Sequence, residues 1–279
     1  GRVQSVVVRL ILEKEIEIEN FFKKNEDSFF KVCGEFFEKK KTFKAQLYNK
    51  KIDKNEESEE NEENNNNNNR GIAKIKKEEN MRQLMKLMIS SKYKVSDITD
   101  RESIRKPSAP FTTATLQQEA SHKLGMTSKR TMTAAQHLYE ATYITYHRTD
   151  SVNLSNEGLK LIGDYIISEH GKEYYLKKNY ESKSKNTQEA HEAIRPTKPK
   201  TTGINENKKD KIGRDEINLY KLIWKRAVAS QMVSAKFKIT SIKIDISEIK
   251  EYYFLTQIEN IIFDGFLAVY NMKNINQEQ

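Results

Sequence analysis

The sequence predicts a multidomain α/β protein of the α+β type, in which a helical region interrupts a β-rich one. Alternating or aromatic-rich segments, which are typical of strands, lie near residues 29–48 and again over 236–258. Between them, apolar residues recur every three or four positions, which places them on one face of a helix. We therefore expect the two strand-rich regions to form one sheet domain into which the helical region is inserted.

The N-terminal segments are a helix, two strands and an insertion. Val3 to about Asn20 is a predicted helix, because its apolar residues recur at helical spacing and neither Pro nor Gly interrupts it. Phe29–Phe37 and Thr42–Tyr48 are predicted strands. Residues 50–71 are dominated by acidic residues and an Asn run, a composition that cannot bury enough surface to offset its ordering entropy. We expect this stretch to be a disordered insertion in a surface loop.

The next segments lead into the helical region. Glu78–Ser91 is a predicted helix whose Met-rich stripe faces the core, and Tyr93–Ile98 is a predicted strand. Lys106–Pro110 is a break in regular structure, because its two prolines interrupt both helices and strands.

Two helices then follow in close succession. Thr113–Leu124 ends at Gly125, which is suited to a C-terminal cap, and a second helix runs from Thr127, as N-cap, to about Glu140. Two helices joined by a short turn with a Gly are a candidate helix-turn-helix motif, whose second helix carries basic and polar side chains for DNA. An ordinary αα-hairpin is the alternative.

The C-terminal half returns from helices to strands. Asn156–Glu169 and Asp215–Ser230 are predicted helices, and the polar stretch 177–187 between them is a predicted loop. Residues 236–246 and 252–258 are predicted strands, and Phe263–Phe266 is predicted to be a tight turn into a further strand.

Composition limits the class of partner and the compartment. The 279 residues suffice for one large domain or for several small ones. Lys and Arg total 49 against 40 acidic residues, and the resulting net charge of +9 favours a polyanion, either nucleic acid or an anionic membrane surface. The single cysteine, Cys33, excludes a disulfide framework within the chain and is typical of a reducing compartment. No apolar run reaches the length of a membrane span, and no signal peptide is recognisable.

The segment Tyr146–Ser151 concentrates a phenol, an imidazole, a guanidinium, hydroxyls and a carboxylate. A tyrosine, with an ordinary pKa of about 10, needs a nearby cation or base to act as a nucleophile at neutral pH. Arg148 lies on the same side as Tyr146 if the backbone is extended, so its guanidinium could stabilise a phenolate and bind a phosphate. The alternative is a pair of ordinary strand residues.

A second cluster, Gln188–Thr197, places His191 between Glu189 and Glu192. His191 could position or protonate a phosphate oxygen, and Arg195 could clamp a backbone phosphate. A His between carboxylates is also a candidate metal ligand, but the spacing differs from that of a His-Glu-x-x-His motif and no second His is near. We assign no metal site to this chain. A solvated loop end is the alternative.

Taken together and in order, these segments resemble the type IA DNA topoisomerases, specifically the bacterial topoisomerase I branch. The resemblance is carried by Pro107–Ala120, Lys123–Gly125, Thr131–Glu140, Tyr143–Ser151 and Gln188–Thr197, with support from Gly1–Ser5, Leu219–Met232 and Phe263–Gly265. It covers most of the chain and fails at the Asn-rich insert and near Lys177–Lys185. His147 stands where the family more usually has Met.

The resemblance implies an ATP-independent enzyme that cleaves one DNA strand through a 5′-phosphotyrosine intermediate, passes a strand and religates. Negatively supercoiled DNA is relaxed by this cycle. By position in the motifs, Tyr146 would be the nucleophile, and Arg148 and His191 would be catalytic. The DNA-binding residues implied in the same way are Gly1, Arg2, Val3, Gln4, Thr149, Asp150 and Arg195.

The family's fold also implies a division of the chain. Residues 1–28 would be part of a DNA-binding domain, 29–105 and 233–279 a β-rich gate domain with the insert at 50–71, and 106–232 the tyrosine-bearing catalytic domain. The family requires Mg²⁺, which is bound by an acidic Toprim domain, and nothing in this chain corresponds to that domain. We therefore expect a fragment that does not relax DNA on its own.

Partner and location follow from the same resemblance. We expect a monomer that binds single-stranded or negatively supercoiled DNA and no membrane. We expect it in the bacterial cytoplasm or in an organelle such as a plastid or mitochondrion, and not secreted. The alternatives are a topoisomerase III-like decatenase and a catalytically incomplete single-stranded-DNA-binding fragment. Topoisomerase III usually has Pro at the position of His147 and Glu at that of Asp150.

Overall fold

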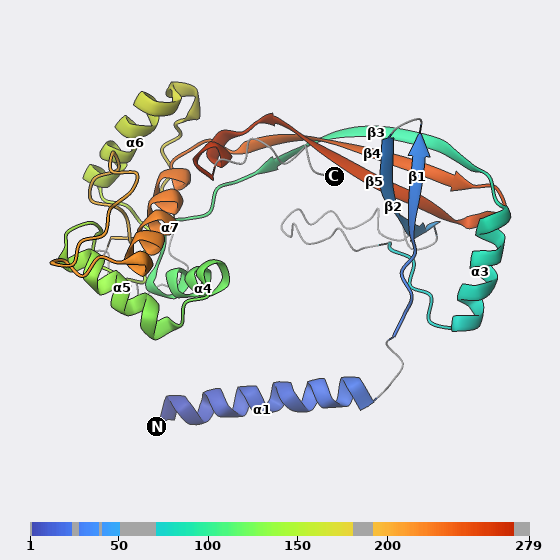
Figure 1. Cartoon of the computed structure of the whole chain (residues 1–279), viewed down its shortest axis with the longest axis horizontal. Coiled ribbons are helices and arrows are strands. Elements are labelled where there is room, and N and C mark those ends of the chain that lie inside the picture. Colours follow the sequence, from blue (N-terminus) through green and yellow to red (C-terminus); the bar gives the residue numbers. More distant parts are fainter. Residues whose placement is uncertain (1, 24–27, 39–40, 51–70, 181–191, 271–279) are drawn as a thin grey trace. The chain divides into compact units, whose positions relative to one another are not determined.

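The structure is a computed structural model that describes residues 2–23, 28–38, 41–50, 71–180 and 192–270 (Figure 1). The predicted disordered insertion at 50–71 lies almost entirely outside these ranges. The helices are α1 (Arg2–Lys23), α3 (Glu78–Ser90), α4 (Thr113–Leu124), α5 (Ser128–Glu140), α6 (Asn156–His170) and α7 (Arg214–Ser230), with short 3-10 helices η2 (Lys172–Tyr174) and η3 (Gly265–Tyr270). The strands are β1 (Cys33–Glu38), β2 (Lys41–Asn49), β3 (Tyr93–Arg105), β4 (Ala235–Ile246) and β5 (Ile249–Phe263).

The chain divides into two compact units. Unit 1 comprises residues 1–101 and 239–258, and unit 2 comprises residues 102–238 and 259–278. Unit 1 holds α1, α3, β1 and β2, and unit 2 holds α4 to α7. Residues 259–270, however, belong with the helices of unit 2 and not with the second strand-rich region.

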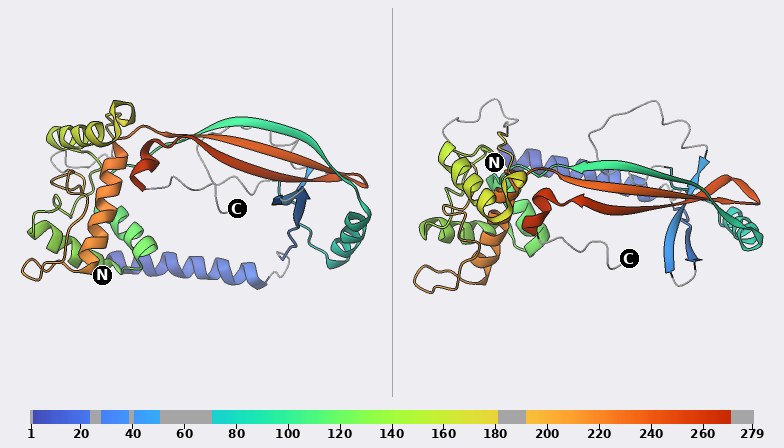
Figure 2. Two further views of the ribbon diagram at one scale, coloured as in Figure 1. Left: turned by 45° about the horizontal axis from the view of Figure 1, so that its top comes forward. Right: turned by 90° about the horizontal axis from the view of Figure 1, so that it is seen from above.

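The strands form one antiparallel-paired, five-stranded sheet in the order β1-β2-β5-β4-β3. β1 and β2 pair from Cys33 opposite Gln46 to Glu38 opposite Lys41, and β2 continues the sheet through Gln46 opposite Leu255. Figure 2 shows β3, β4 and β5 running alongside one another over most of their length. The expected joining of the two strand-rich regions in one sheet is therefore confirmed.

Strand β3 is longer than the sequence predicts. The prediction ended at Ile98, whereas the strand continues to Arg105. Its polar second half is mostly exposed and has no clear apolar alternation, so the pattern gives no signal there. Side-chain contacts support this half instead. Thr240 donates a hydrogen bond to Asp100 at 2.6 Å, and Nη2 of Arg105 lies 2.8 Å from both carboxylate oxygens of Glu259.

Unit 1 has a core on one face of the sheet. Helix α3 contributes Leu84 and Met88, which confirms that part of its Met-rich stripe faces the core. The strands and adjoining segments contribute the remaining buried apolar residues: Val32, Ala45, Leu47, Ala73, Ile75, Ile244, Ile246, Ile249 and Phe254. Helix α1 extends the predicted segment at both ends, and every side chain described in it is exposed.

Helices α4 to α7 enclose the core of unit 2. The caps predicted at Gly125 and Thr127 are present: Gly125 ends α4 with φ +62°, and the Thr127 hydroxyl accepts a hydrogen bond from the first turn of α5. The hydroxyls of Thr112 and Ser155 cap α4 and α6 in the same way. The buried side chains include Phe111, Leu116, Ala134, Leu138, Ile144, Ile162, Ile166, Leu219, Ile223 and Trp224. This core holds the segments that lead into and out of Tyr146.

The prediction of a strand after Phe263–Phe266 is wrong, because the chain enters the 3-10 helix η3. Gly265 has φ +49°, and a Cβ at this position would lie 2.7 Å from the carbonyl oxygens of Val233 and Ser234. The backbone N–H of Phe266 donates to the Val233 carbonyl at 3.0 Å. These contacts turn the chain back, and Leu267 packs against Ala235 and Phe237.

Candidate active site

Tyr146 lies in the loop that follows α5. The helix ends at Ala141, and Thr142 then adopts a left-handed conformation with φ +61°. The N–H of Thr142 donates to the Tyr139 carbonyl and that of Tyr143 donates to the Leu138 carbonyl, both at 2.9 Å, a pattern that reverses the chain at a helix end. Tyr146 is 47% exposed, so its side chain is open to solvent on a backbone that is closely tied to the core.

The two chemically rich segments found in the sequence lie side by side. Ile144 bridges to Pro196, the N–H of Thr145 donates to the Arg195 carbonyl at 2.9 Å, and the N–H of Thr197 donates to the Tyr143 carbonyl at 3.0 Å. The Thr145 hydroxyl also donates to the Ala193 carbonyl at 2.9 Å. Residues 193–197 therefore form a short extended partner for the segment that leads into Tyr146.

Helix α4 holds the other side of the loop through Thr113. Its hydroxyl donates to the carbonyl of His147 at 2.7 Å and accepts from the N–H of Thr149 at 2.8 Å. Its own N–H donates to the Thr149 carbonyl at 2.9 Å. The backbone on both sides of Arg148 is thus fixed to the first residue of α4.

Aromatic rings surround the phenol of Tyr146. Tyr139, at the end of α5, meets it edge-on with ring centroids 5.3 Å apart, and His147 meets it at 5.2 Å. His147 is 1% exposed, and its ring is also 5.8 Å from that of Tyr139. Burial lowers the pKa of His147, the nearby Arg148 guanidinium lowers it further, and the Glu140 carboxylate partly offsets these effects.

Arg148 and Asp150 are exposed, and neither has a hydrogen bond or ion pair within the described part of the chain. Thr149 is buried, and its hydroxyl accepts the N–H of Ser151 at 3.0 Å. Ser151 in turn accepts the N–H of Asn153 at 3.1 Å. The loop therefore presents the phenol, a guanidinium and a carboxylate outward, whereas its hydroxyls hold the backbone.

Arg195 lies inside the protein and not on its surface. Its guanidinium donates to Glu192 at 2.5 Å, to the Pro196 carbonyl at 3.1 Å and to the Ser155 hydroxyl at 3.4 Å. Burial alone would raise the pKa of Glu192, but hydrogen bonds from Arg195 and Ser155 outweigh it and lower the pKa. This buried pair ties the 192–197 segment to the start of α6, where Gly158 leaves room for it.

The remaining residues predicted for the site are His191 and Gly1 to Gln4. His191 and Gly1 fall outside the described residues, and nothing is described of the Arg2 side chain. Val3 and Gln4 lie in α1, which belongs to unit 1, whereas Tyr146 belongs to unit 2.

The α4–α5 pair packs as a hairpin of helices on α7. Ala134 and Leu138 of α5 are buried in the core of unit 2. Arg130 pairs with Asp215 of α7, and His137 Nδ1 lies 2.9 Å from a carboxylate oxygen of Glu216. Much of the polar surface of α5 is therefore engaged within the protein, which favours the αα-hairpin interpretation for those side chains.

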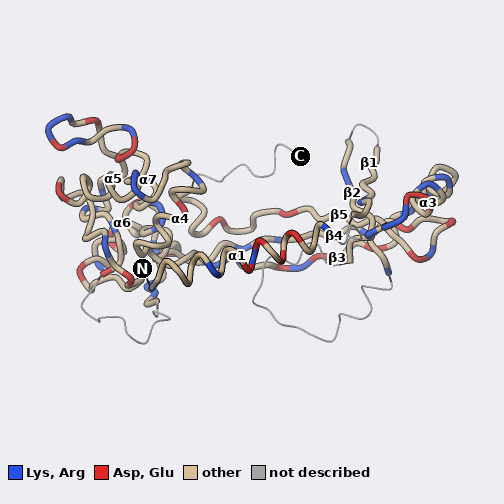
Figure 3. The backbone as a smooth tube through the Cα atoms, turned by 90° about the horizontal axis from the view of Figure 1, so that it is seen from below, with Lys and Arg blue, Asp and Glu red and all other residues tan. Residues whose placement is uncertain are grey.

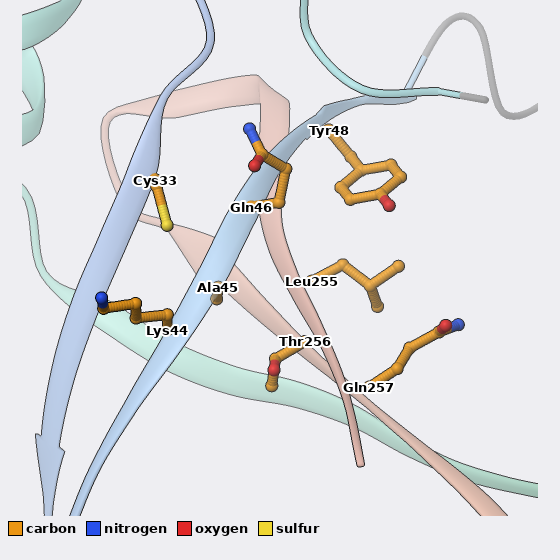
Figure 4. A pocket seen from close by; sticks show the side chains of 8 residues that line it. All are labelled: Cys33, Lys44, Ala45, Gln46, Tyr48, Leu255, Thr256 and Gln257. Atoms are coloured by element: carbon orange, nitrogen blue, oxygen red, sulfur yellow. The ribbon is translucent and has the colours of Figure 1, made fainter. Parts of the chain in front are cut away.

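Tyr146 lines neither of two cavities in the described residues. One, of about 300 Å³, opens on the sheet between Cys33, Lys44 and Gln257 (Figure 4). The other, of about 310 Å³, lies beside Arg130 and Asp215. In the described ranges, no group of three or more His, Cys, Asp or Glu side chains could hold a metal ion. No helix in those ranges is long and apolar enough to cross a membrane.

Sequence reasoning did not assign individual roles to Thr113 and Tyr139. Both belong to segments of the family resemblance, but neither has the reactive character that singles out a nucleophile or a phosphate ligand. Their contacts depend on bringing α4 and α5 against the loop of Tyr146, and no local pattern reports those contacts.

Comparison with known proteins shows which family the chain matches and what share of the related proteins it spans. The chain matches the family model for DNA topoisomerase over residues 1–279. It is 44% identical to "DNA topoisomerase 1 type prokaryotic" of Acanthamoeba polyphaga mimivirus over 280 residues, which cover 97% of this chain and 32% of that protein. DNA topoisomerase 1 of Xylella fastidiosa strain 9a5c is 37% identical over 281 residues, with the same two coverages of 97% and 32%.

A solved structure agrees with this family. Full-length topoisomerase I from Thermotoga maritima matches with a TM-score of 0.68 and 28% identity, over 98% of this chain and 40% of that one. The chain thus spans 32% of the length of the curated relatives cited above.

Proposed function

The chain belongs to the DNA topoisomerase family, and on that premise we propose that it carries the DNA-cleaving tyrosine of a type IA enzyme that relaxes negatively supercoiled DNA. The observation that carries the proposal is that Tyr146 and Arg148, two residues apart in one loop, are both exposed. The loop between them is fixed to α4 and to residues 193–197. A nucleophile held on a fixed backbone meets its target with little loss of orientational freedom.

In the proposed reaction, the Tyr146 phenol oxygen attacks a phosphodiester phosphorus of one DNA strand. The bond from phosphorus to the 3′ oxygen breaks as the bond to tyrosine forms. The phenol proton is released to solvent, and the departing 3′ oxygen takes up a proton. The 5′-phosphotyrosine retains the phosphoester, so attack by the 3′-hydroxyl reverses the step without ATP. Arg148 would neutralise the charge on the phosphate through bidentate hydrogen bonds.

The remaining predicted residues take narrower roles. His191 would contact the active-site phosphate, and Asp150 would bound the same pocket. Thr149 and Arg195 would act indirectly, because both are buried and engaged with the backbone or with Glu192. Gly1 to Gln4 would contact single-stranded DNA beside the site. Basic side chains are interspersed with acidic ones along both units, and the net charge of +9 suits such a partner (Figure 3).

The proposed domain arrangement assigns the helices of unit 2 to a movable tyrosine domain and the sheet of unit 1 to a gate. Its support is the sheet itself, in which strands before and after the helices pair. Opening of such a gate would let a strand pass. Mg²⁺ would be held by a part of the enzyme that does not correspond to the described residues, and it would offset phosphate charge when bound. We propose a monomer that acts where bacterial or organellar DNA lies.

Covalent trapping tests the proposal. The longest natural protein that contains this chain is mixed with single-stranded DNA and Mg²⁺ and is then denatured. Tyr146→Phe should remove the covalent DNA adduct and leave DNA binding intact. Tyr139→Phe is the matched control, because it deletes a hydroxyl from the adjacent ring, and it should keep the adduct. An adduct that persists in Tyr146→Phe shows that another residue is the nucleophile.

Plasmid relaxation tests the expected incompleteness of the chain. The 279-residue chain should leave negatively supercoiled plasmid unchanged with Mg²⁺, whereas the longer protein should relax it. Relaxation by the chain alone would show that the whole catalytic machinery lies within these residues.

A further inference from the structure

The imidazole of His147 is a polar ring without a polar environment. It is 1% exposed, and neither ring nitrogen has a hydrogen-bond partner among the described residues. A neutral imidazole offers one donor and one acceptor, and burying such groups without partners costs free energy. The ring must therefore be held by packing.

That packing involves the proposed nucleophile. The rings of Tyr139, Tyr146 and His147 are in mutual contact, with centroid separations of 5.2 to 5.8 Å. The backbone of His147 is fixed independently, because its carbonyl accepts the Thr113 hydroxyl at 2.7 Å. Of the three rings, that of His147 is almost fully enclosed whereas the other two are partly exposed. The imidazole is thus a buried support beside the Tyr146 ring.

We propose that neutral His147 is a positioning residue that holds the Tyr146 phenol ring toward the DNA phosphate, and that protonation of the imidazole releases this ring. The inference rests on the proposed role of Tyr146 as the nucleophile. It deepens that role by making the geometry of the nucleophile depend on the charge of its neighbour.

The charged groups nearby explain why a protonated His147 ring would leave its buried position. An imidazolium has two donors and needs acceptors, and the described residues offer none. The charged groups that act on the ring are Arg148, which repels the imidazolium, and Glu140 at the end of α5, which attracts it. The titratable rings beside it are the phenols of Tyr139 and Tyr146. Burial and Arg148 prevail and lower the pKa of His147, so the ring is neutral at pH 7 and charges only at acidic pH.

A spectroscopic experiment decides the inference without any assay of activity. The protein is labelled with ¹³C in its His and Tyr rings and titrated from pH 8 to pH 4.5, with His147→Met to assign the His147 signal. His147 should titrate below the ordinary histidine pKa of about 6.5, and the Tyr146 ring signals should shift with the same midpoint. In His147→Met, the Tyr146 signals should not move over this range. Unmoved Tyr146 signals in the wild type during the His147 titration overturn the proposal.

Cleavage rates then connect the switch to function. Each variant's rate of adduct formation is expressed relative to its own rate at pH 8. Below the His147 midpoint, the wild type should slow as the pH falls, toward the loss of about ten- to a hundredfold expected when the Tyr146 ring has no support. His147→Met, which fills similar space without a titrating group, should lack this decline, and His122→Met should keep it. If His147→Met shows the same decline, protonation of His147 is not its cause and the proposal is wrong.

Packing is tested separately with His147→Ala. Loss of support for the ring should slow cleavage by about ten- to a hundredfold at pH 8 with little change in DNA affinity, and Met at the same position should restore most of the rate. If no adduct forms at any pH in the wild type, the proposed function of Tyr146 fails, and the spectroscopic titration still decides whether His147 positions its ring.

Discussion

The hydroxyl of Thr113, in the first turn of α4, donates a hydrogen bond to the carbonyl of His147 at 2.7 Å, directly after Tyr146. The same oxygen accepts the N–H of Thr149 at 2.8 Å. One side chain of a helix therefore fixes the backbone that carries the proposed nucleophile and its arginine.

Thr113→Val should loosen this loop while keeping the shape of the side chain. The substitution leaves the N–H of Thr149 and the carbonyl of His147 without their partner, which costs about 1–3 kcal/mol for groups that are partly buried. Adduct formation should slow by more than DNA binding weakens, as measured by single-turnover cleavage and by a binding isotherm. Thr133→Val on α5 is the control, since its exposed hydroxyl only bonds the Lys129 carbonyl of its own helix. Equal slowing in both variants would contradict a specific role for Thr113.

Gly158→Ala should disturb the buried ion pair behind the site. A Cβ on Gly158 would clash with Nε of Arg195 and would lie 2.8 Å from a carboxylate oxygen of Glu192. Because these groups are held by each other and by Ser155, the overpacking should cost about 1–3 kcal/mol of unfolding free energy. Urea denaturation measures this loss. Gly203→Ala, where the new Cβ meets nothing within 4 Å, should be near neutral.

Thr142→Gly should stabilise the protein. Thr142 adopts φ +61°, which costs a β-branched residue about 1–2 kcal/mol. Gly has more conformational freedom than Thr in the unfolded chain, and this freedom offsets about 0.4–1 kcal/mol of the stability gained by relieving the strain. The unfolding free energy should therefore rise by about 1 kcal/mol or less. This rise should appear as a higher denaturation midpoint. Thr133→Gly, in the interior of α5, should have the opposite sign because a helix disfavours Gly. A fall in the midpoint for Thr142→Gly would show that the backbone at this position is not strained.

The Glu192–Arg195 pair should make stability depend on pH on the acid side. The pKa of Glu192 is lower in the folded protein than its ordinary value, so the unfolded chain takes up the proton first as the pH falls. The contribution is fully present above the ordinary pKa of the carboxyl and is lost as the pH falls through the folded-state pKa. Denaturation between pH 7 and pH 3 measures the slope.

Glu192→Gln tests the assignment of that slope. It should lower stability at pH 7 by about 3 kcal/mol, because it leaves the Arg195 charge buried without its partner, and it should flatten the decline toward acid. Glu169→Gln, an exposed carboxylate on α6, should do neither. An unchanged slope in Glu192→Gln would mean that other carboxylates dominate the acid response.

Local patterns predicted the elements with strong periodicity or clear caps. The helices α4 to α7 and the caps at Gly125 and Thr127 lie where side-chain spacing and capping chemistry place them. The polar end of β3 and the turn into η3 were mispredicted. In both cases the backbone depends on partners distant in sequence: the neighbouring strand for β3, and the Val233 carbonyl for η3.

By itself, the sequence determined the family and singled out the candidate reactive groups, because a phenol, a guanidinium and their ordered neighbouring motifs can be read directly from the chain. The tertiary structure decided which of them face outward. It left Tyr146 and Arg148 exposed, and it placed Arg195 against Glu192 and enclosed His147. The reason is that burial and pairing depend on contacts between segments far apart in sequence, and a guanidinium or an imidazole has the same formula whether it meets DNA or a carboxylate within the core.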